Sequence, residues 1–318
     1  MARLVSKKNH PTPKGNGSVP FGAHQMNLCA RGILWALMSL APCVAWASEA
    51  APMNPWSQIH QPLRGEAQSI GSPSAGCLQG ATALAPDGPG FLLVRPSRRR
   101  FFGHPRLVTL LQEIARQREA QKQPPLLIGD LGLPRGGPTL SAHASHQTGL
   151  DVDIWYQTPR PWLRRKKVSI RERERASAPP MVNQKQREIL PSFSQQTREL
   201  LRQFAERDET DRILVHFSIK RELCRKNANA PWIRKIRPWY GHDHHFHVRI
   251  RCAPQDSLCK SGEAIPEGNG CDASLDWWWS EEARAEEKKN AEKRSTPTMP
   301  ELPSECSKII NPSTASKT

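Results

Sequence analysis

Residues 150–156 read LDVDIWY and residues 246–252 read FHVRIRC, and in both stretches apolar and polar side chains alternate. Alternation with a period of two predicts a strand with one apolar face. Residues 126–128 (LLI) form a shorter apolar candidate strand before the glycine-rich stretch GDLGLPRGG, and residues 213–215 form another. These stretches predict a sheet built from segments far apart in the chain.

Helical periodicity marks the segments between these strands. Residues 105–121 place leucines and an isoleucine on one helical face, and two prolines at 124 and 125 end the pattern. Residues 193–207 predict a second helix and residues 219–226 a short one. We therefore expect an α+β fold, with a central, mostly antiparallel sheet flanked by helices and long loops in a single disulfide-stapled domain.

The start of the chain has the layout of an export signal. Residues 31–48 (RGILWALMSLAPCVAWAS) show a positive residue, an apolar stretch and a small-x-small ending at Ala45-Trp46-Ala47. We expect residues 1–47 to be a signal peptide, with Met26 as an alternative start because the residues before it are unusually polar. The apolar stretch is too short for a comfortable membrane span, so no retained membrane helix is expected.

Three other segments lack clean periodicity. Residues 48–100, rich in Pro, Gly and Ser, predict an extended, loop-like start that wraps a core. The basic segment 160–180 predicts a surface excursion that could contact an anionic polymer. Residues 276–318 hold a charged run, SEEARAEEKKNAEKR, expected to be a solvated helix or linker, and then a Pro/Ser-rich tail.

The formal net charge of +16 is partly due to the leader, because residues 1–47 contain five basic and no acidic residues. The remainder is still basic, which suits a polyanionic partner or simply keeps the chain in solution. Six cysteines follow the leader, and an even count in an exported protein predicts disulfides. Spacing alone singles out only Cys252 with Cys259 as a local loop. The absence of any CxxC pair argues against a cysteine zinc site.

Six of the eleven histidines fall, with aspartates, in two short segments, HASHQTGLDVD at 143–153 and GHDHHFH at 241–247. His and Asp are ligands that catalytic zinc accepts, with one position left for water. A turn at Gly149 can bring His146 and Asp153 to one metal ion, and Asp151 shares a strand face with Asp153.

His245 and His247 lie two apart on a strand, so one can bind the metal while the other lies near the attacking water. Two other interpretations stay open at this point. The histidines could form an incidental tract that binds metals loosely, or the site could be structural zinc, although structural sites usually recruit cysteines.

Several longer motifs resemble those of the penicillin-insensitive murein endopeptidases, within the zinc peptidases related to D-Ala-D-Ala carboxypeptidases. They span roughly residues 55–271 and are PWSQIHQPLRGEAQSIGSPSAGC, RRRFFGHPRLV, LLIGDLGLPRGG, ASHQTGLDVDIW, the DRI…IKRELC stretch and WYGHDHHFHVRIRC.

The resemblance implies a site and a reaction. His146, Asp153 and His247 would bind Zn²⁺, and His245 would be the general base or transition-state stabiliser. His242 and His143 would line the site. The reaction implied is hydrolysis of D-alanyl to meso-diaminopimelyl cross-links of peptidoglycan in the periplasm.

Two departures from the family pattern matter. Ala144 stands where related carboxypeptidases have Ser, and residues 157–200 contain no Asp-x-x-His, so we do not expect a full second metal site that would use His143.

The resemblance also implies how the domain is closed. The implied disulfides are Cys77 with Cys306, Cys224 with Cys271, and Cys252 with Cys259. Residues 48–275 would form the zinc peptidase domain, and Cys306 would tie the tail back to its start.

Two functions from other classes compete with this interpretation. An inactive peptidoglycan-binding accessory protein could keep the same fold, but the complete set of ligands disfavours it. A basic nuclease would fit the charge, but the chain lacks a clear phosphate-binding loop, so no nucleic-acid partner is expected. The sequence predicts no oligomeric state.

Overall fold

The computed structural model describes residues 54–312 apart from 140–142, 166, 186 and 296–297. The expected signal peptide at 1–47 and its alternative start at Met26 lie outside the described residues. Within the described part of the chain, no helix is both long enough and apolar enough to cross a membrane.

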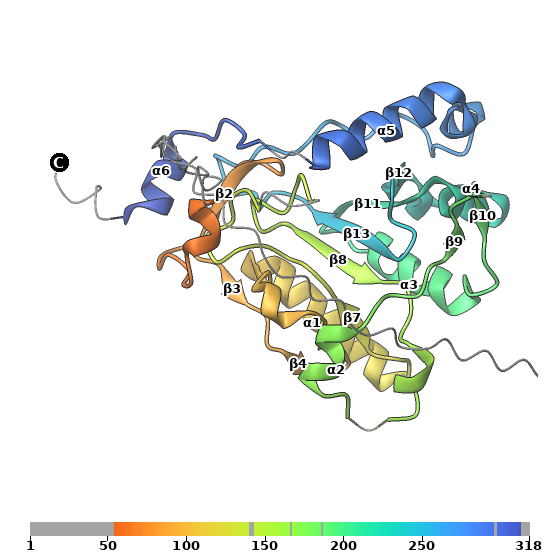
Figure 1. Cartoon of the computed structure of the whole chain (residues 1–318), viewed down its shortest axis with the longest axis horizontal. Coiled ribbons are helices and arrows are strands. Elements are labelled where there is room, and N and C mark those ends of the chain that lie inside the picture. Colours follow the sequence, from red (N-terminus) through yellow and green to blue (C-terminus); the bar gives the residue numbers. More distant parts are fainter. Residues whose placement is uncertain (1–53, 140–142, 166, 186, 296–297, 313–318) are drawn as a thin grey trace, which may run out of the picture. The chain divides into compact units, whose positions relative to one another are not determined.

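A seven-stranded sheet forms the centre of the fold, in the order β12-β11-β13-β8-β7-β5-β4 (Figure 1). Only the β12–β11 and β7–β5 pairs are parallel, so the prediction of a mostly antiparallel sheet is confirmed. The strands are β4 (Asp87–Gly88), β5 (Phe91–Leu93), β7 (Leu126–Ile128), β8 (Asp151–Trp155), β11 (Thr210–His216), β12 (Ile236–Trp239) and β13 (His245–Ile250).

Three helices cover one face of this sheet. They are α1 (Pro105–Ala120), α3 (Gln195–Ala205) and α4 (Phe217–Asn227), close to the bounds that periodicity predicts. Their apolar side chains share one buried core with the apolar residues of the strands, such as Val152, Ile154 and Val248. Because side chains alternate along a strand, the polar residues of β8 and β13 project from the opposite face. The sheet thus separates a packed apolar face from a polar face.

The start of the domain is more ordered than the sequence suggested. Residues expected to be loop-like form a hairpin of β1 (Gln68–Ser72) and β2 (Ala75–Gln79), and two short strands, β3 (Thr82–Ala83) and β6 (Phe102–Gly103), pair with each other. Gly76 is required here, because a Cβ at this position would meet the Ile70 carbonyl oxygen at 2.3 Å. The sequence did not reveal this hairpin, because both of its strands contain Gly, which is depleted in strands.

The basic segment 160–180 also contains a helix that periodicity did not reveal. In α2 (Ile170–Arg175) the side chain of Ser169 caps the backbone N–H of Glu172, and the Glu172 side chain returns to the Ser169 backbone. This capping box was visible in the sequence as S-x-x-E. Arg173 is buried and pairs with Asp87, which fastens α2 to the edge of the sheet.

The remaining helices and strands complete the described chain. They are β9 (Val182–Asn183), β10 (Glu188–Ile189), five 3-10 helices (Pro55–Gln58, Pro96–Arg98, Arg160–Trp162, Pro231–Lys235 and Ala273–Trp279), α5 (Glu281–Ser295) and α6 (Glu305–Ile310). The charged run of the sequence is α5.

Three disulfides are present, Cys77–Cys306, Cys224–Cys271 and Cys252–Cys259, and they are the pairs that the family resemblance implied. The first joins residues 229 positions apart and fastens α6 to β2. A small second core of Trp56, Ile70 and Ile309 surrounds it. Because this disulfide closes a long loop, it strongly reduces the conformational entropy of the unfolded chain.

The buried His216 makes stability sensitive to acid. Its Nδ1 caps α4 by accepting the backbone N–H of Ser218, so the ring must stay neutral in this role. Burial lowers the pKa of His216 to about 4, with Asp243 opposing and Arg187 adding to the shift. The unfolded chain binds more protons than the folded chain between about pH 6.5 and 4, so stability falls as pH falls through this window.

We therefore predict that His216 accounts for about 2 kcal/mol of lost stability at pH 5 relative to neutral pH. His216→Asn keeps a capping acceptor but does not titrate. In urea unfolding at pH 7.5 and pH 5.0, the variant should lose about 2 kcal/mol less than the wild type. Equal acid losses in both proteins would contradict this account.

Candidate active site

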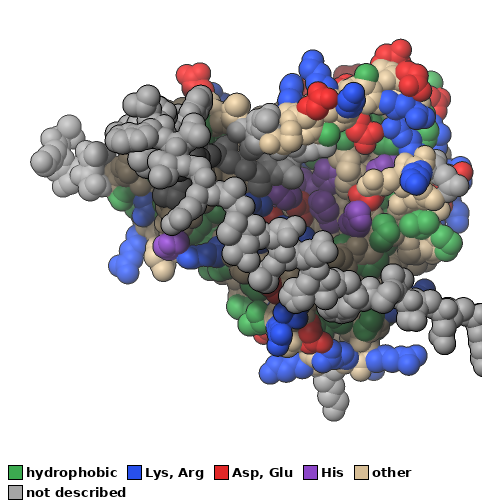
Figure 2. Space-filling model, in the orientation of Figure 1, with side chains coloured by type: hydrophobic (Ala, Val, Ile, Leu, Met, Phe, Trp, Pro, Cys, Tyr) green, Lys and Arg blue, Asp and Glu red, His purple; other side chains and the backbone are tan. Residues whose placement is uncertain are grey.

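The pairing of β8 with β13 brings the two histidine-rich segments together. In this antiparallel register His247 lies opposite Asp153 and Arg249 lies opposite Asp151. All four side chains are on the polar face of the sheet, because residues directly opposite each other share a face. Figure 2 shows histidine side chains gathered together on this side of the molecule.

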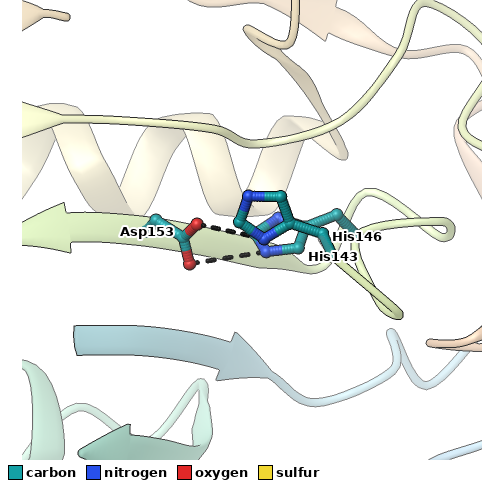
Figure 3. A group of neighbouring side chains, drawn as sticks. All are labelled: His143, His146 and Asp153. Carbon is teal, nitrogen blue, oxygen red and sulfur yellow. Dashed lines mark ion pairs between the residues drawn. The ribbon is translucent and has the colours of Figure 1, made fainter. Parts of the chain in front are cut away.

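Asp153 is at the centre of the cluster, and its carboxylate is buried. Its Oδ1 lies 3.4 Å from His146 Nε2 and 3.2 Å from His247 Nδ1. Its Oδ2 lies 3.5 Å from His143 Nδ1 (Figure 3). Donor atoms of His143, His146 and Asp153 all lie within 4.8 Å of one another, close enough to share one metal ion.

One ring nitrogen of His146 faces the Asp153 carboxylate and has no hydrogen-bond partner among the described residues. His146 Nδ1 donates to the Leu131 carbonyl at 2.6 Å, so Nε2 is the nitrogen that faces Asp153. Nε2 is buried and, among the described residues, has no hydrogen-bond partner. A buried imidazole nitrogen without a partner is unusual, and a metal ligand in its ion-free form would look like this. The backbone of His146 has a φ of 71°, in the sparsely populated left-handed region.

Asp151 positions both of these histidines. Its Oδ1 accepts from His247 Nε2 at 2.8 Å and from Arg249 Nε at 2.7 Å, and its Oδ2 accepts the backbone N–H of His146 at 3.1 Å. Because His247 donates from Nε2 to Asp151, Nδ1 is the nitrogen that faces Asp153 Oδ1, at 3.2 Å. A carboxylate behind a metal-binding histidine fixes the tautomer and orientation of the ring in this way.

The carboxylates and imidazoles shift one another's pKa values. Burial alone would raise the pKa of Asp151, but Arg249 and His247 lower it far below its usual range. Burial alone would lower the pKa of His146, but Asp153, followed by Asp151, raises it to about 9. The cluster therefore keeps its acids ionised despite burial.

His143 lies between two carboxylates at the edge of the cluster. Its Nε2 is 3.3 Å from Asp130 Oδ2, which also accepts from Arg100 at 3.0 Å and from Arg98 at 3.2 Å. Burial would raise the pKa of Asp130, but His143 and Arg100 lower it to about 2. Sequence reasoning gave Asp130 no role, although it follows the short buried strand β7 in GDLGLPRGG.

His245 and His242 form the more open side. His245 Nε2 lies 3.8 Å from Asp153 Oδ1, and 30% of its side chain is exposed. Burial lowers the pKa of His245, with Asp153 opposing, and so favours the neutral ring. His242 donates from Nδ1 to the Tyr240 carbonyl at 2.8 Å, and its ring centre lies 5.2 Å from that of His245. Burial, then His245 and His247, lower the pKa of His242 to about 3.

Every histidine and aspartate named from the sequence as a site residue thus lies in one cluster. His244, between two of them in the chain, pairs instead with Asp243 at 2.8 Å and is half exposed. Arg249, Asp151 and Asp130 were missed as positioning residues. Alternation along β8 does place Asp151 on the face of Asp153, as the sequence predicts, but it does not reveal that Asp151 accepts from His247.

The sequence of the chain matches a family of known proteins. The sequence profile described as penicillin-insensitive murein endopeptidase matches residues 69–311. Two proteins of that name, from Klebsiella pneumoniae subsp. pneumoniae and Salmonella newport, are 38% identical to this chain. The first alignment covers 81% of this chain and 91% of the relative, and the second covers 87% and 97%.

A third relative of the same name, from Salmonella paratyphi C, is 36% identical over 84% of this chain and 96% of its own length. The profile match includes both histidine-rich segments and all six disulfide-bonded cysteines. This chain therefore belongs to the penicillin-insensitive murein endopeptidase family.

Proposed function

We propose that the chain is a zinc-dependent endopeptidase of the periplasm that hydrolyses D-alanyl to meso-diaminopimelyl cross-links in peptidoglycan. Membership of the family supports the substrate. The observation that carries the metal-dependent part is the convergence of His146 Nε2 and His247 Nδ1 on the buried carboxylate of Asp153. Export by a signal peptide at 1–47 is part of the same proposal.

The donor set fits zinc. Two imidazoles and one carboxylate are a common set for catalytic zinc with an open position, and no cysteine lies in the cluster. The buried Nε2 of His146, which has no hydrogen-bond partner in the described part of the structure, also supports a bound cation. When bound, zinc supplies a Lewis acid that polarises the scissile carbonyl and makes a water more acidic.

The choice between His143 and His247 as the third ligand rests on their surroundings. His247 is buried and held by Asp151, which leaves its Nδ1 facing the site. His143 is more exposed, and its other nitrogen faces Asp130. We therefore assign His146, Asp153 and His247 as ligands and His143 as a residue that lines the site.

The remaining histidines have roles in proton transfer and positioning. His245 is partly exposed and its neutral form is favoured, so it can accept the proton of the attacking water and later pass it to the leaving amine. His242 has its Nε2 free of the Tyr240 contact and lies beside His245. It is placed to contact the substrate near the bond that is cleaved.

The direct test is digestion of purified sacculi with and without a chelator, with the products identified by mass. Cross-linked muropeptides should be converted to monomers, and the chelator should abolish this conversion. His146→Ala, Asp153→Ala and His247→Ala should each lose zinc and reduce the rate by at least about a hundredfold. His244→Ala, from the same segment but outside the cluster, is the matched control and should retain both.

Two outcomes would reject the assignment. Stoichiometric zinc in His146→Ala or Asp153→Ala would mean that the ligands lie elsewhere. Binding to sacculi without any cleavage would instead indicate an accessory protein that binds peptidoglycan.

Asp151→Asn tests the positioning of the ligands separately. An amide can still accept from Arg249, but it holds the His247 ring less strongly, so zinc affinity should fall about 10-fold to 100-fold. Competition against a zinc chelator measures this change. Asp243→Asn is the control, because Asp243 contacts His244 and Gln184 rather than the ligands. An unchanged zinc affinity in Asp151→Asn would refute the positioning role.

A further inference from the structure

A second feature of the polar sheet face is a cavity of about 260 Å³ over β11 and β12, which we call the β12 pocket. Strand residues Arg212, Leu214, Arg237 and Trp239 contribute to its lining. Segments 263–266 and 270–278 supply further lining residues, among them Gly270 and Trp278. None of these residues belongs to the cluster of histidines and aspartates.

The strand register places this pocket beside the candidate active site. Asp153 pairs with His247, His247 with Leu214, and Leu214 with Arg237, so these four side chains form one row across the same sheet face. Neighbouring strands are about 4.8 Å apart, which puts the backbone of Arg237 about 10 Å from that of His247. An extended peptide covers this distance in about three residues.

The pocket contains an arginine, Arg237, one of whose guanidinium nitrogens has no hydrogen-bond partner among the described residues. Arg237 Nη1 is buried and has no hydrogen-bond partner among the described residues. Gly270 lies close to it, since a Cβ at that position would meet Nη1 at 2.8 Å. Burial and then Arg212 lower the pKa of Arg237, while Asp272 opposes them.

The other charged residues of the pocket do not satisfy Arg237. Arg212 donates to Asp211 and to the Glu263 backbone carbonyl. Glu263 also lines the pocket, but it is exposed, and no ion pair joins it to Arg237 in the described part of the chain. An unsatisfied guanidinium with a second arginine beside it favours an anionic ligand.

An exposed aromatic side chain lies next to this cation. Trp239 is 48% exposed, an unusual degree for so large an apolar side chain, and it shares a strand face with Arg237. It precedes the site residue His242 by three positions. An exposed indole beside an arginine suits a ligand with an apolar part next to a carboxylate.

We propose that the β12 pocket binds a carboxylate of the substrate's peptide stem, about three residues from the bond that is cleaved. Arg237 pairs with this carboxylate, and Trp239 packs against the neighbouring part of the peptide. This inference rests on the proposed function, since it takes the substrate to be a cross-linked stem peptide. It makes the pocket a specificity site outside the reacting centre.

The test compares Arg237→Gln with the wild type on a purified cross-linked muropeptide dimer. KM should rise by about tenfold or more, with kcat nearly unchanged and zinc content the same. Arg237→Lys should recover part of the loss, because it keeps the charge but not the planar fork. Arg225→Gln, at an arginine that is 72% exposed and does not line the pocket, should match the wild type.

A second substrate identifies the carboxylate as the partner. When the carboxylates of the dimer are converted to amides with a carbodiimide and ammonia, the wild type and Arg237→Gln should have equal KM values. An unchanged KM for the natural dimer in Arg237→Gln, or an equal defect on the amidated dimer, would overturn the proposal.

Trp239→Ala keeps the test valid if Arg237→Gln fails to fold. It should weaken binding of the dimer in a tryptophan fluorescence titration, whereas Leu163→Ala, an exposed apolar residue elsewhere, should not. Unchanged binding in Trp239→Ala would count against the pocket. A wild type that binds the dimer through Arg237 but does not cleave it would refute the proposed function while supporting the pocket.

Discussion

Two ionised carboxylates are buried at adjacent positions on the polar face of β8, and the arrangement of the site follows from the need to compensate them. A buried carboxylate without partners costs several kcal/mol. Asp151 is compensated within the protein, by Arg249, His247 and a backbone N–H. Among the described residues, the charged partners of the Asp153 carboxylate are imidazole nitrogens, at 3.2 to 3.8 Å. Of these contacts only that with His247 Nδ1, at 3.2 Å, is a hydrogen bond, and a cation among these atoms would compensate the charge more fully.

One face of the sheet forms the apolar core, and the opposite face carries the side chains of the candidate site. On one face, α1, α3 and α4 bury the apolar side chains of the strands in a single core. That packing fixes the register of β8 against β13, because a slip of one residue would turn every side chain to the other face. The same register sets His247 opposite Asp153 and aligns Leu214 and Arg237 with them. The geometry of the site and that of the β12 pocket therefore depend on the apolar core behind them.

Much of the site could be predicted from the sequence, because its residues are local to two strands with clear alternation. Periodicity located β7, β8, β13, α1 and α3 closely, and the clustering of histidines indicated which segments meet. The disulfide pairs came from the family resemblance, since spacing alone left all but Cys252–Cys259 undetermined. Asp130 was not predicted, nor were Arg98 and Arg100, which pair with it, because the contact of Asp130 with His143 depends on how two loops fold together. The β1–β2 hairpin was missed because its glycines and serines are typical of loops.

The central claim is that His146, Asp153 and His247 hold one zinc ion with a coordination position left for solvent. Anomalous diffraction at the zinc absorption edge from crystals of the zinc-loaded protein tests it directly. We expect a single anomalous peak within bonding distance of His146 Nε2, a carboxylate oxygen of Asp153 and His247 Nδ1, with a water as the remaining ligand. An ion enclosed by four protein ligands, or one bound by His143 in place of His247, would contradict it.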